Sequence, residues 1–388
     1  MRTVTFTSDN YIKLLNSGME YFPELIVAFD QAQEEIWLET YIFALDETGE
    51  DIKAALERAA QRGIDVRLIT DWVGTGSAVS KRLTRELAAA GAKHCSFNPW
   101  FKRGVVRTHR KMCVVDRKLA FLGGLNINND FRSDDNPNVI LPAPRWDFAV
   151  KIEGTLVAAI HREIEIQWAR LHNTNLKARW QRFKSARASR IAATDTPALA
   201  ALVIRDNLRN RRTIQRSYLQ ALGRARKSAW LANPYFAPGR KLRDALASAA
   251  SRGVQVTLLL GVGQYRLQDA VAQSFYPKLL AAGVRIVEYR KTQLHGKVGV
   301  VDDDWATVGS SNYDGFSLFV NQEANIVVKD AGFAEALRRH IEDGINEGVE
   351  IRLEEFANTP WYRRAWYGFA YMLYKSVLRM LTWGRYVE

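Results

Sequence analysis

The sequence has little cysteine and no long apolar run. Cys95 and Cys113 are the only cysteines among 388 residues, which excludes a disulfide framework and favours a reducing compartment. No stretch of about 18 uncharged apolar residues occurs, so we expect no transmembrane helix. The first residues also lack the apolar core of a signal peptide. Any contact with a membrane must then come from the protein surface.

Acidic residues are in the minority. Lys and Arg number 55 against 42 Asp and Glu, and the net charge of +13 predicts attraction to polyanions. Charge alone leaves nucleic acid and an anionic membrane surface open as partners. A hydrophobic content of 47% indicates a packed globular core, and the length allows two domains or one duplicated domain.

One pattern of histidine, lysine and aspartate occurs twice. Its members are His109, Lys111 and Asp116 in the first copy and His295, Lys297 and Asp302 in the second. Each copy is followed by a glycine-rich turn that ends in an asparagine, Asn126 or Asn312. A shared spacing and a shared downstream turn indicate shared chemistry rather than two accidents.

The motifs belong to a longer internal repeat. Strands are expected at 36–43 and 229–236, helices at 52–62 and 242–252, second strands at 64–69 and 254–259, and motif hairpins at 111–122 and 297–308. Strands that alternate with helices predict β-α-β crossovers. We therefore expect a duplicated α/β fold: two halves with mostly parallel sheets, related by a pseudo-twofold axis, with the active site at their interface.

The expected domains follow from this repeat. They are an N-terminal half (1–176), a basic connector (177–204), a C-terminal half (205–350) and a tail (351–388). The connector has no acid between Lys177 and Arg190. A solvated basic face and a surface that binds anionic lipid explain this composition about equally well.

The residue types suit a phosphodiester. Side chains two apart on a strand point to the same face, so each half presents one imidazole and one ammonium together. If the halves pack about the twofold axis, both pairs surround one phosphate, and no metal or other cofactor is required. One histidine then attacks phosphorus and the other protonates the departing alcohol. Lys111 and Lys297 stabilise the non-bridging oxygens.

Further residues support this site. Asn126, Asn312 and Ser310 are candidate donors to the phosphate. Asp147 and Glu323, on a later strand of each half, are candidates to orient a histidine. Asp116 and Asp302 complete the motif and are catalytic candidates, although capping of a hairpin turn is the stronger interpretation of both.

These motifs resemble the phospholipase D superfamily, whose signature is His-x-Lys-x4-Asp followed by Gly-(Gly/Ser)-x-Asn. The resemblance spans about residues 8–350 and is greatest to bacterial cardiolipin synthases without N-terminal membrane spans. It implies phosphatidyl transfer between two phosphatidylglycerol molecules, release of glycerol, a phosphatidyl-histidine intermediate and no metal. It also favours His109 as nucleophile and His295 as acid and base. The two halves differ in two places. Gly124 stands in the first half where the second half has Ser310. The first half also carries an insertion at 132–145, which either narrows the cleft, touches lipid or is a plain surface loop.

Residues 361–385 are rich in Trp, Tyr and Leu, carry five basic residues and have no acid. This pattern predicts a helix in the lipid headgroup region, with packing on the protein core as the alternative. We expect a peripheral enzyme on the cytoplasmic face of the cell membrane that binds anionic phospholipid and no nucleic acid. A phospholipase D-type or nuclease-type hydrolase on the same scaffold, and a non-catalytic polyanion-binding protein, remain the alternatives.

Overall fold

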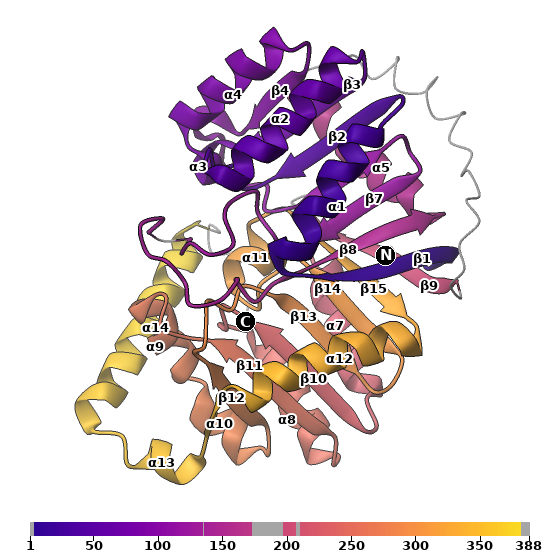
Figure 1. Ribbon diagram of the computed structural model, residues 1–388. Coiled ribbons are helices and arrows are strands. Elements are labelled where there is room, and N and C mark those ends of the chain that lie inside the picture. Colours follow the sequence, from indigo (N-terminus) through magenta and orange to yellow (C-terminus); the bar gives the residue numbers. More distant parts are fainter. Residues whose placement is uncertain (1–3, 135, 173–196, 207–209, 382–388) are drawn as a thin grey trace.

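The computed structural model describes residues 4–134, 136–172, 197–206 and 210–381 (Figure 1). A single mixed sheet of 15 strands runs through both halves. Its order is β16-β12-β11-β10-β13-β14-β15-β9-β1-β8-β7-β6-β2-β3-β4. The antiparallel pair β1 and β9 lies at the centre, so the two halves continue each other's sheet across the pseudo-twofold axis.

The N-terminal half comprises the first eight strands and five helices. They are β1 (Thr7–Asn16), α1 (Ser17–Gln31), β2 (Glu35–Thr40), α2 (Glu47–Gln61), β3 (Asp65–Asp71), α3 (Trp72–Thr75), α4 (Ser77–Ala89), β4 (Lys93–Phe97), β5 (Lys102–Val105), β6 (Met112–Val115), β7 (Leu119–Gly123), β8 (Phe148–Gly154) and α5 (Leu156–Leu171). A short 3-10 helix (Pro99–Phe101) joins β4 to β5.

The C-terminal half repeats this order. Its elements are β9 (Ala198–Arg205), α7 (Thr213–Arg224), β10 (Ser228–Asn233), α8 (Arg240–Ser251), β11 (Gln255–Gly261), α9 (Arg266–Gln273), α10 (Tyr276–Ala281), β12 (Arg285–Tyr289), β13 (Lys297–Val301), β14 (Trp305–Gly309), α11 (Gly315–Phe319), β15 (Glu323–Lys329), α12 (Ala331–Asn346) and β16 (Val349–Ile351). Two helices follow, α13 (Leu353–Ala357) and α14 (Trp361–Leu381).

The duplicated α/β fold predicted from the sequence is confirmed, but the expectation of mostly parallel sheets is wrong. Among the strands that the structure describes, parallel pairing is confined to β2-β3-β4 and β10-β11-β12. The motif hairpins β6-β7 and β13-β14 pair antiparallel and join each parallel group to the centre. Helical crossovers keep strands parallel, whereas a tight hairpin turn reverses the chain.

Both faces of the sheet are covered by helices. One core contains side chains of α5 and α12 and extends across both halves. On the other face, α1, α2 and α4 cover the N-terminal half, while α7, α8 and α10 cover the C-terminal half. Helix α2 is representative: the Asp46 carboxylate accepts from the Gly49 N–H at 3.0 Å at its start, and Gly63 at φ +89° follows its end.

The connector boundary requires a correction. Residues 198–204, assigned to the connector from sequence, lie in β9 between β1 and β15, because their run of alanine, leucine, valine and isoleucine packs there. The basic stretch from Lys177 to Arg190 lies outside the described residues. Within the described part of the chain, no helix is both long and apolar enough to cross a bilayer.

Candidate active site

Two short backbone contacts between the halves build the centre of the molecule. The His109 N–H donates to the Gln322 carbonyl at 2.9 Å, and the His295 N–H donates to the Trp146 carbonyl at 2.9 Å. The first motif thus meets the residue before β15 of the C-terminal half, and the second motif meets a residue just before β8 of the N-terminal half. The next residues along the chain are Glu323 and Asp147, so each carboxylate is placed beside a histidine.

The carboxylates cross between the halves. His109 Nδ1 lies 3.0 Å from Glu323 Oε2, and His295 Nδ1 lies 2.6 Å from Asp147 Oδ2. The sequence named both carboxylates as candidates to orient a histidine without deciding which histidine each contacts, and the structure places each beside the histidine of the other half. The reason is the twofold arrangement, which brings β8 against the second motif and β15 against the first.

Each Nδ1 faces a carboxylate, so each Nδ1 carries the proton and each Nε2 keeps its lone pair. His109 Nδ1 also lies 3.0 Å from the Ser310 carbonyl, which favours the same tautomer. Burial lowers the pKa of His109, and burial together with Lys297 lowers the pKa of His295 to about 4. Both imidazoles are neutral at pH 7 in the free enzyme and are available as nucleophile or base.

The two lysines lie between these pairs. Lys111 Nζ donates to the His109 carbonyl at 2.9 Å, and Lys297 Nζ donates to the His295 carbonyl. Both side chains are buried. Burial and the neighbouring Lys297 lower the pKa of Lys111 to about 7, and burial lowers that of Lys297 to about 8. The charge of Lys297 acts on both His109 and Lys111, so the two motifs share one electrostatic environment.

These lysine pKa values predict a pH-dependent anion site. Sulfate keeps its charge between pH 7 and pH 9, while the free enzyme loses protons from Lys111 and then Lys297. Each deprotonated lysine must regain a proton on binding, so the apparent affinity for sulfate is expected to fall about tenfold from pH 7 to pH 8 and more steeply above. Titration calorimetry measures this. The Lys111→Met variant should show the shallower slope of one titrating lysine, and an affinity that stays constant to pH 9 would contradict the assignment.

The asparagines of the glycine-rich turns are buried near the two motifs. Asn126 Oδ1 accepts from the Ile42 N–H at 3.3 Å, which leaves its Nδ2 donor for another partner. Asn312 is also buried, and its Oδ1 has no hydrogen-bond partner among the described residues.

Ser310 and Gly124 differ for a structural reason. The Ser310 hydroxyl donates to Glu323 Oε2 at 2.5 Å, so it contacts the carboxylate that orients His109. At the equivalent position in the first half, a Cβ on Gly124 would lie 2.2 Å from Asp147 Oδ1. The shorter Asp147 side chain fills the space that a serine would need.

Asp116 and Asp302 are not brought to the histidines. Asp116 accepts from the N–H groups of Gln33, Glu34 and Glu35, and Asp302 accepts from those of Arg226, Lys227 and Ser228. Each aspartate follows the far end of the strand that begins at the motif lysine, roughly 16 Å along it at about 3.3 Å per residue. Their inclusion as catalytic residues is corrected: they cap the loops that enter β2 and β10.

Asp134 is a further residue of the site that was not predicted from the sequence. This residue lies in the insertion at 132–145, and its Oδ2 is 3.8 Å from His295 Nε2. The buried Arg145 holds it, with Nη1 at 3.1 Å from Asp134 Oδ1. The insertion therefore places a carboxylate beside the histidine of the second motif. No local signal marks Asp134, because it stands among the asparagines, aspartates and prolines of an ordinary loop.

Comparison with known proteins agrees with this geometry. A family model described as cardiolipin synthase, phospholipase D-like domain, matches residues 25–163 and 218–344. The chain is 36% identical to cardiolipin synthase B of Escherichia coli (strain K12), over 95% of this chain and 86% of that protein. It is 37% identical to cardiolipin synthase B of Salmonella typhi, over 91% and 85%.

The fold is also similar to a solved structure, the phosphatidylserine synthase of Haemophilus influenzae. The TM-score is 0.70 with coverage of 98% of this chain and 97% of that chain, at 15% identity, which supports the fold alone. The family model spans both motifs, and the relatives match nearly the whole chain. The chain thus belongs to the phospholipase D-like family and, within it, to the cardiolipin synthases, which are phosphatidyltransferases that act on phospholipids.

Proposed function

We propose that the enzyme transfers the phosphatidyl group of one phosphatidylglycerol to a second, giving cardiolipin and glycerol through a phosphatidyl-histidine intermediate. The observation that carries this proposal is the pair of crossed histidine–carboxylate contacts around two buried lysines. This arrangement provides two neutral imidazoles and a cationic pocket for one phosphodiester anion.

In the first step His109 Nε2 attacks phosphorus. Glu323 holds the Nδ1 proton and stabilises the positive charge that develops on the ring as the P–N bond forms. The P–O bond to glycerol breaks, and His295 gives its proton to the departing oxygen. The bound phosphodiester carries the negative charge that raises the low pKa of His295 towards the range in which it holds this proton.

In the second step the hydroxyl of another phosphatidylglycerol attacks the phosphatidyl group on His109. His295 accepts the hydroxyl proton, with Asp147 holding its other nitrogen, and the P–N bond breaks. Lys111 and Lys297, together with the amides of Asn126 and Asn312, neutralise and hold the non-bridging oxygens in both transition states. Ser310 acts on His109 through Glu323.

Phosphatidylglycerol vesicles test this function directly. The purified enzyme should convert them into cardiolipin and an equal amount of glycerol. Phosphatidic acid as the sole lipid product would identify a hydrolase, in which water replaces the second lipid. The absence of turnover together with retained polyanion binding would favour a binding protein.

The tail supports a peripheral position on a membrane. Helix α14 packs one face on the core, where Tyr371 stacks edge-on against Phe275 and the Tyr374 hydroxyl accepts from the Gly315 N–H at 2.6 Å. The opposite face exposes large apolar side chains, and Trp361 is 77% accessible. The exposed apolar set is Trp361, Tyr362, Trp366, Phe369, Met372, Leu373 and Met380.

Helix α14 packs on the protein core, which was the alternative in the sequence analysis, and it still presents an exposed apolar face. Its contact with lipid headgroups stays a prediction. Arg363, Arg364, Lys375 and Arg379 are exposed on the same helix. Exposed aromatic side chains beside basic residues suit the headgroup region of an anionic leaflet. The anionic lipids of the cytoplasmic leaflet also attract a protein whose net charge is +13.

Two methionines provide a matched test of this surface. Met372 on α14 and Met19 on α1 are both 62% exposed. The Met372→Ser variant is expected to bind phosphatidylglycerol vesicles at least about tenfold more weakly, since burying this side chain in lipid is worth about 1.5–3 kcal/mol. Met19→Ser should bind like the parent. Co-sedimentation with vesicles measures binding, and equal losses from the two sites would rule out α14 as the docking surface.

A further inference from the structure

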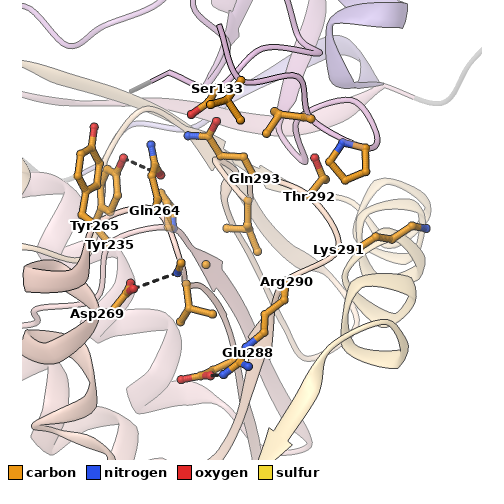
Figure 2. Close-up of a pocket in the computed structure, with 18 of the residues that line it drawn as sticks. Ser133, Tyr235, Gln264, Tyr265, Asp269, Glu288, Arg290, Lys291, Thr292 and Gln293 are labelled. Atoms are coloured by element: carbon orange, nitrogen blue, oxygen red, sulfur yellow. Dashed lines mark hydrogen bonds and ion pairs between the residues drawn. The ribbon is translucent and has the colours of Figure 1, made fainter. Parts of the chain in front are cut away.

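A cavity of about 550 Å³ opens beside the second motif (Figure 2). It lies where the three parallel strands of the C-terminal half end, between the loops that follow β10, β11 and β12. Crevices at the carboxyl ends of parallel strands are where open α/β sheets bind ligands. The residues after β12 run directly into His295, and Gln293 and Leu294 line the cavity wall.

The cavity adjoins the acid/base histidine through the insertion loop. The Asp134 N–H donates to Gln293 Oε1 at 3.2 Å, and the Asp134 carboxylate lies 3.8 Å from His295 Nε2. Ser133, the preceding residue, lines the cavity. An alcohol bound in this cavity would therefore reach the reaction centre from the side of His295 rather than that of His109.

Neutral polar groups gather at one end of the cavity. Figure 2 shows Ser133, Gln293, Gln264 and Tyr235 together, with the Tyr235 hydroxyl donating to Gln264 Oε1 at 3.1 Å. Gln293 Nε2 is a buried donor with no partner among the described residues. A buried amide donor without a partner destabilises the empty cavity, so a ligand that accepts its hydrogen bond binds more tightly.

The opposite end carries charges that are already paired. Glu288, only 1% exposed, contacts Arg290 at 2.5 Å and accepts from Gln273 at 3.2 Å. Asp269 accepts from the Gly263 N–H at 3.0 Å. Lys291, which also lines the cavity, pairs with Glu347.

This lining excludes two kinds of ligand. Acyl chains would leave the buried amide of Gln293 without a hydrogen-bond partner. A second phosphate would meet two carboxylates, while both cations are occupied. A small neutral alcohol with several hydroxyl groups fits the remaining chemistry, because each hydroxyl both donates and accepts.

The first half differs at the equivalent place. The segments that follow β3 and β4 bring together Trp72, Trp100 and Phe101, with ring centroids 5.2 and 5.6 Å from Trp72. Trp100 and Phe101 are exposed. Helices α3 and α9, which follow β3 and β11, lie on the same side of the view in Figure 1. The two symmetry-related edges thus present an aromatic surface in one half and a polar cavity in the other.

We propose that this cavity is the subsite for the polyol headgroup of the alcohol that leaves and of the alcohol that attacks. This inference rests on the proposed function. In the second step a hydroxyl of the bound polyol forms the new P–O bond, the P–N bond to His109 breaks, and the hydroxyl proton passes to His295 Nε2. Gln264 and Gln293 hold the other hydroxyl groups, so the cavity selects a polyol over water.

The test uses a phosphatidyl donor with a p-nitrophenyl headgroup, which leaves without a proton and does not resemble glycerol. Free glycerol is the acceptor probe, and the ratio of phosphatidylglycerol to phosphatidic acid is measured against glycerol concentration. Both products come from the same variant in the same assay, so a general loss of activity lowers both and leaves their ratio unchanged. In Gln264→Leu and Gln293→Leu the glycerol concentration for half transfer should rise at least about tenfold. The matched control is Gln255→Leu, at the exposed opposite end of β11.

The outcomes separate the subsite from the function itself. If the parent enzyme transfers to glycerol and both cavity variants keep its ratio, the subsite is wrong while the function stands. If the parent makes only phosphatidic acid at every glycerol concentration, the transferase proposal fails first. Ethanolamine used in preference to glycerol would also overturn the subsite, because the carboxylates would then be recognising an ammonium group.

Discussion

Replacement of His109 by alanine is expected to abolish release of p-nitrophenol from the chromogenic phosphatidyl donor. The imidazole supplies the attacking nitrogen, and loss of a covalent nucleophile costs on the order of 10⁶-fold in other enzymes. His295→Ala should behave differently with this donor, because p-nitrophenolate departs without the proton that His295 supplies. We expect one rapid turnover followed by arrest, since no base remains to activate the acceptor.

Rapid-mixing absorbance and labelling of the protein, measured without acid because a P–N bond to histidine hydrolyses in acid, distinguish the two variants. With phosphatidylglycerol itself both variants should be inactive, because glycerol needs a proton to leave. A burst that persists in His109→Ala and disappears in His295→Ala would reverse the two roles. Steady turnover by His295→Ala would exclude it as the base for the second step.

The second large expected effect is on the rate of the burst and comes from substituting Glu323, the carboxylate that contacts His109 from the other half. In the His295→Ala background the burst reports the attack of His109 alone. Glu323→Gln added to this background should slow the burst by about 10³–10⁴-fold, because an amide cannot stabilise the imidazolium or hold its tautomer. Asp147→Asn should slow it less than about tenfold, since its histidine partner is already absent.

Pairing within each half predicts the opposite order. Under that arrangement Asp147 would serve His109, and Asp147→Asn would cause the larger loss. Both carboxylates are buried, so thermal unfolding of each variant shows whether a slow burst reflects chemistry or an unfolded fraction. Comparable losses from the two substitutions would contradict the crossed geometry.

Much of the fold was predictable from the chain. The repeat of strand, helix and strand at 36–69 and 229–259 corresponds to β2-α2-β3 and β10-α8-β11. The motif hairpins correspond to β6-β7 and β13-β14. Such elements are recognisable because apolar spacing and glycine positions depend on residues close together in sequence. The antiparallel pairing of the central strands between the two motif hairpins was not predictable, because it depends on which strands become neighbours.

The sequence by itself predicted the two histidines and two lysines of the site and their place at the start of the motif hairpins, since the motif spacing is a local property. The histidines themselves lie just before β6 and β13 rather than on a strand. Only the tertiary structure decided the partners. Glu323 is 214 residues from His109 and Asp147 is 148 residues from His295, so no local pattern records either contact. The same holds for Asp134 beside His295 and for the polar cavity. Each arises where segments of both halves meet, and that meeting is set by how the two halves pack about the central strands β1 and β9.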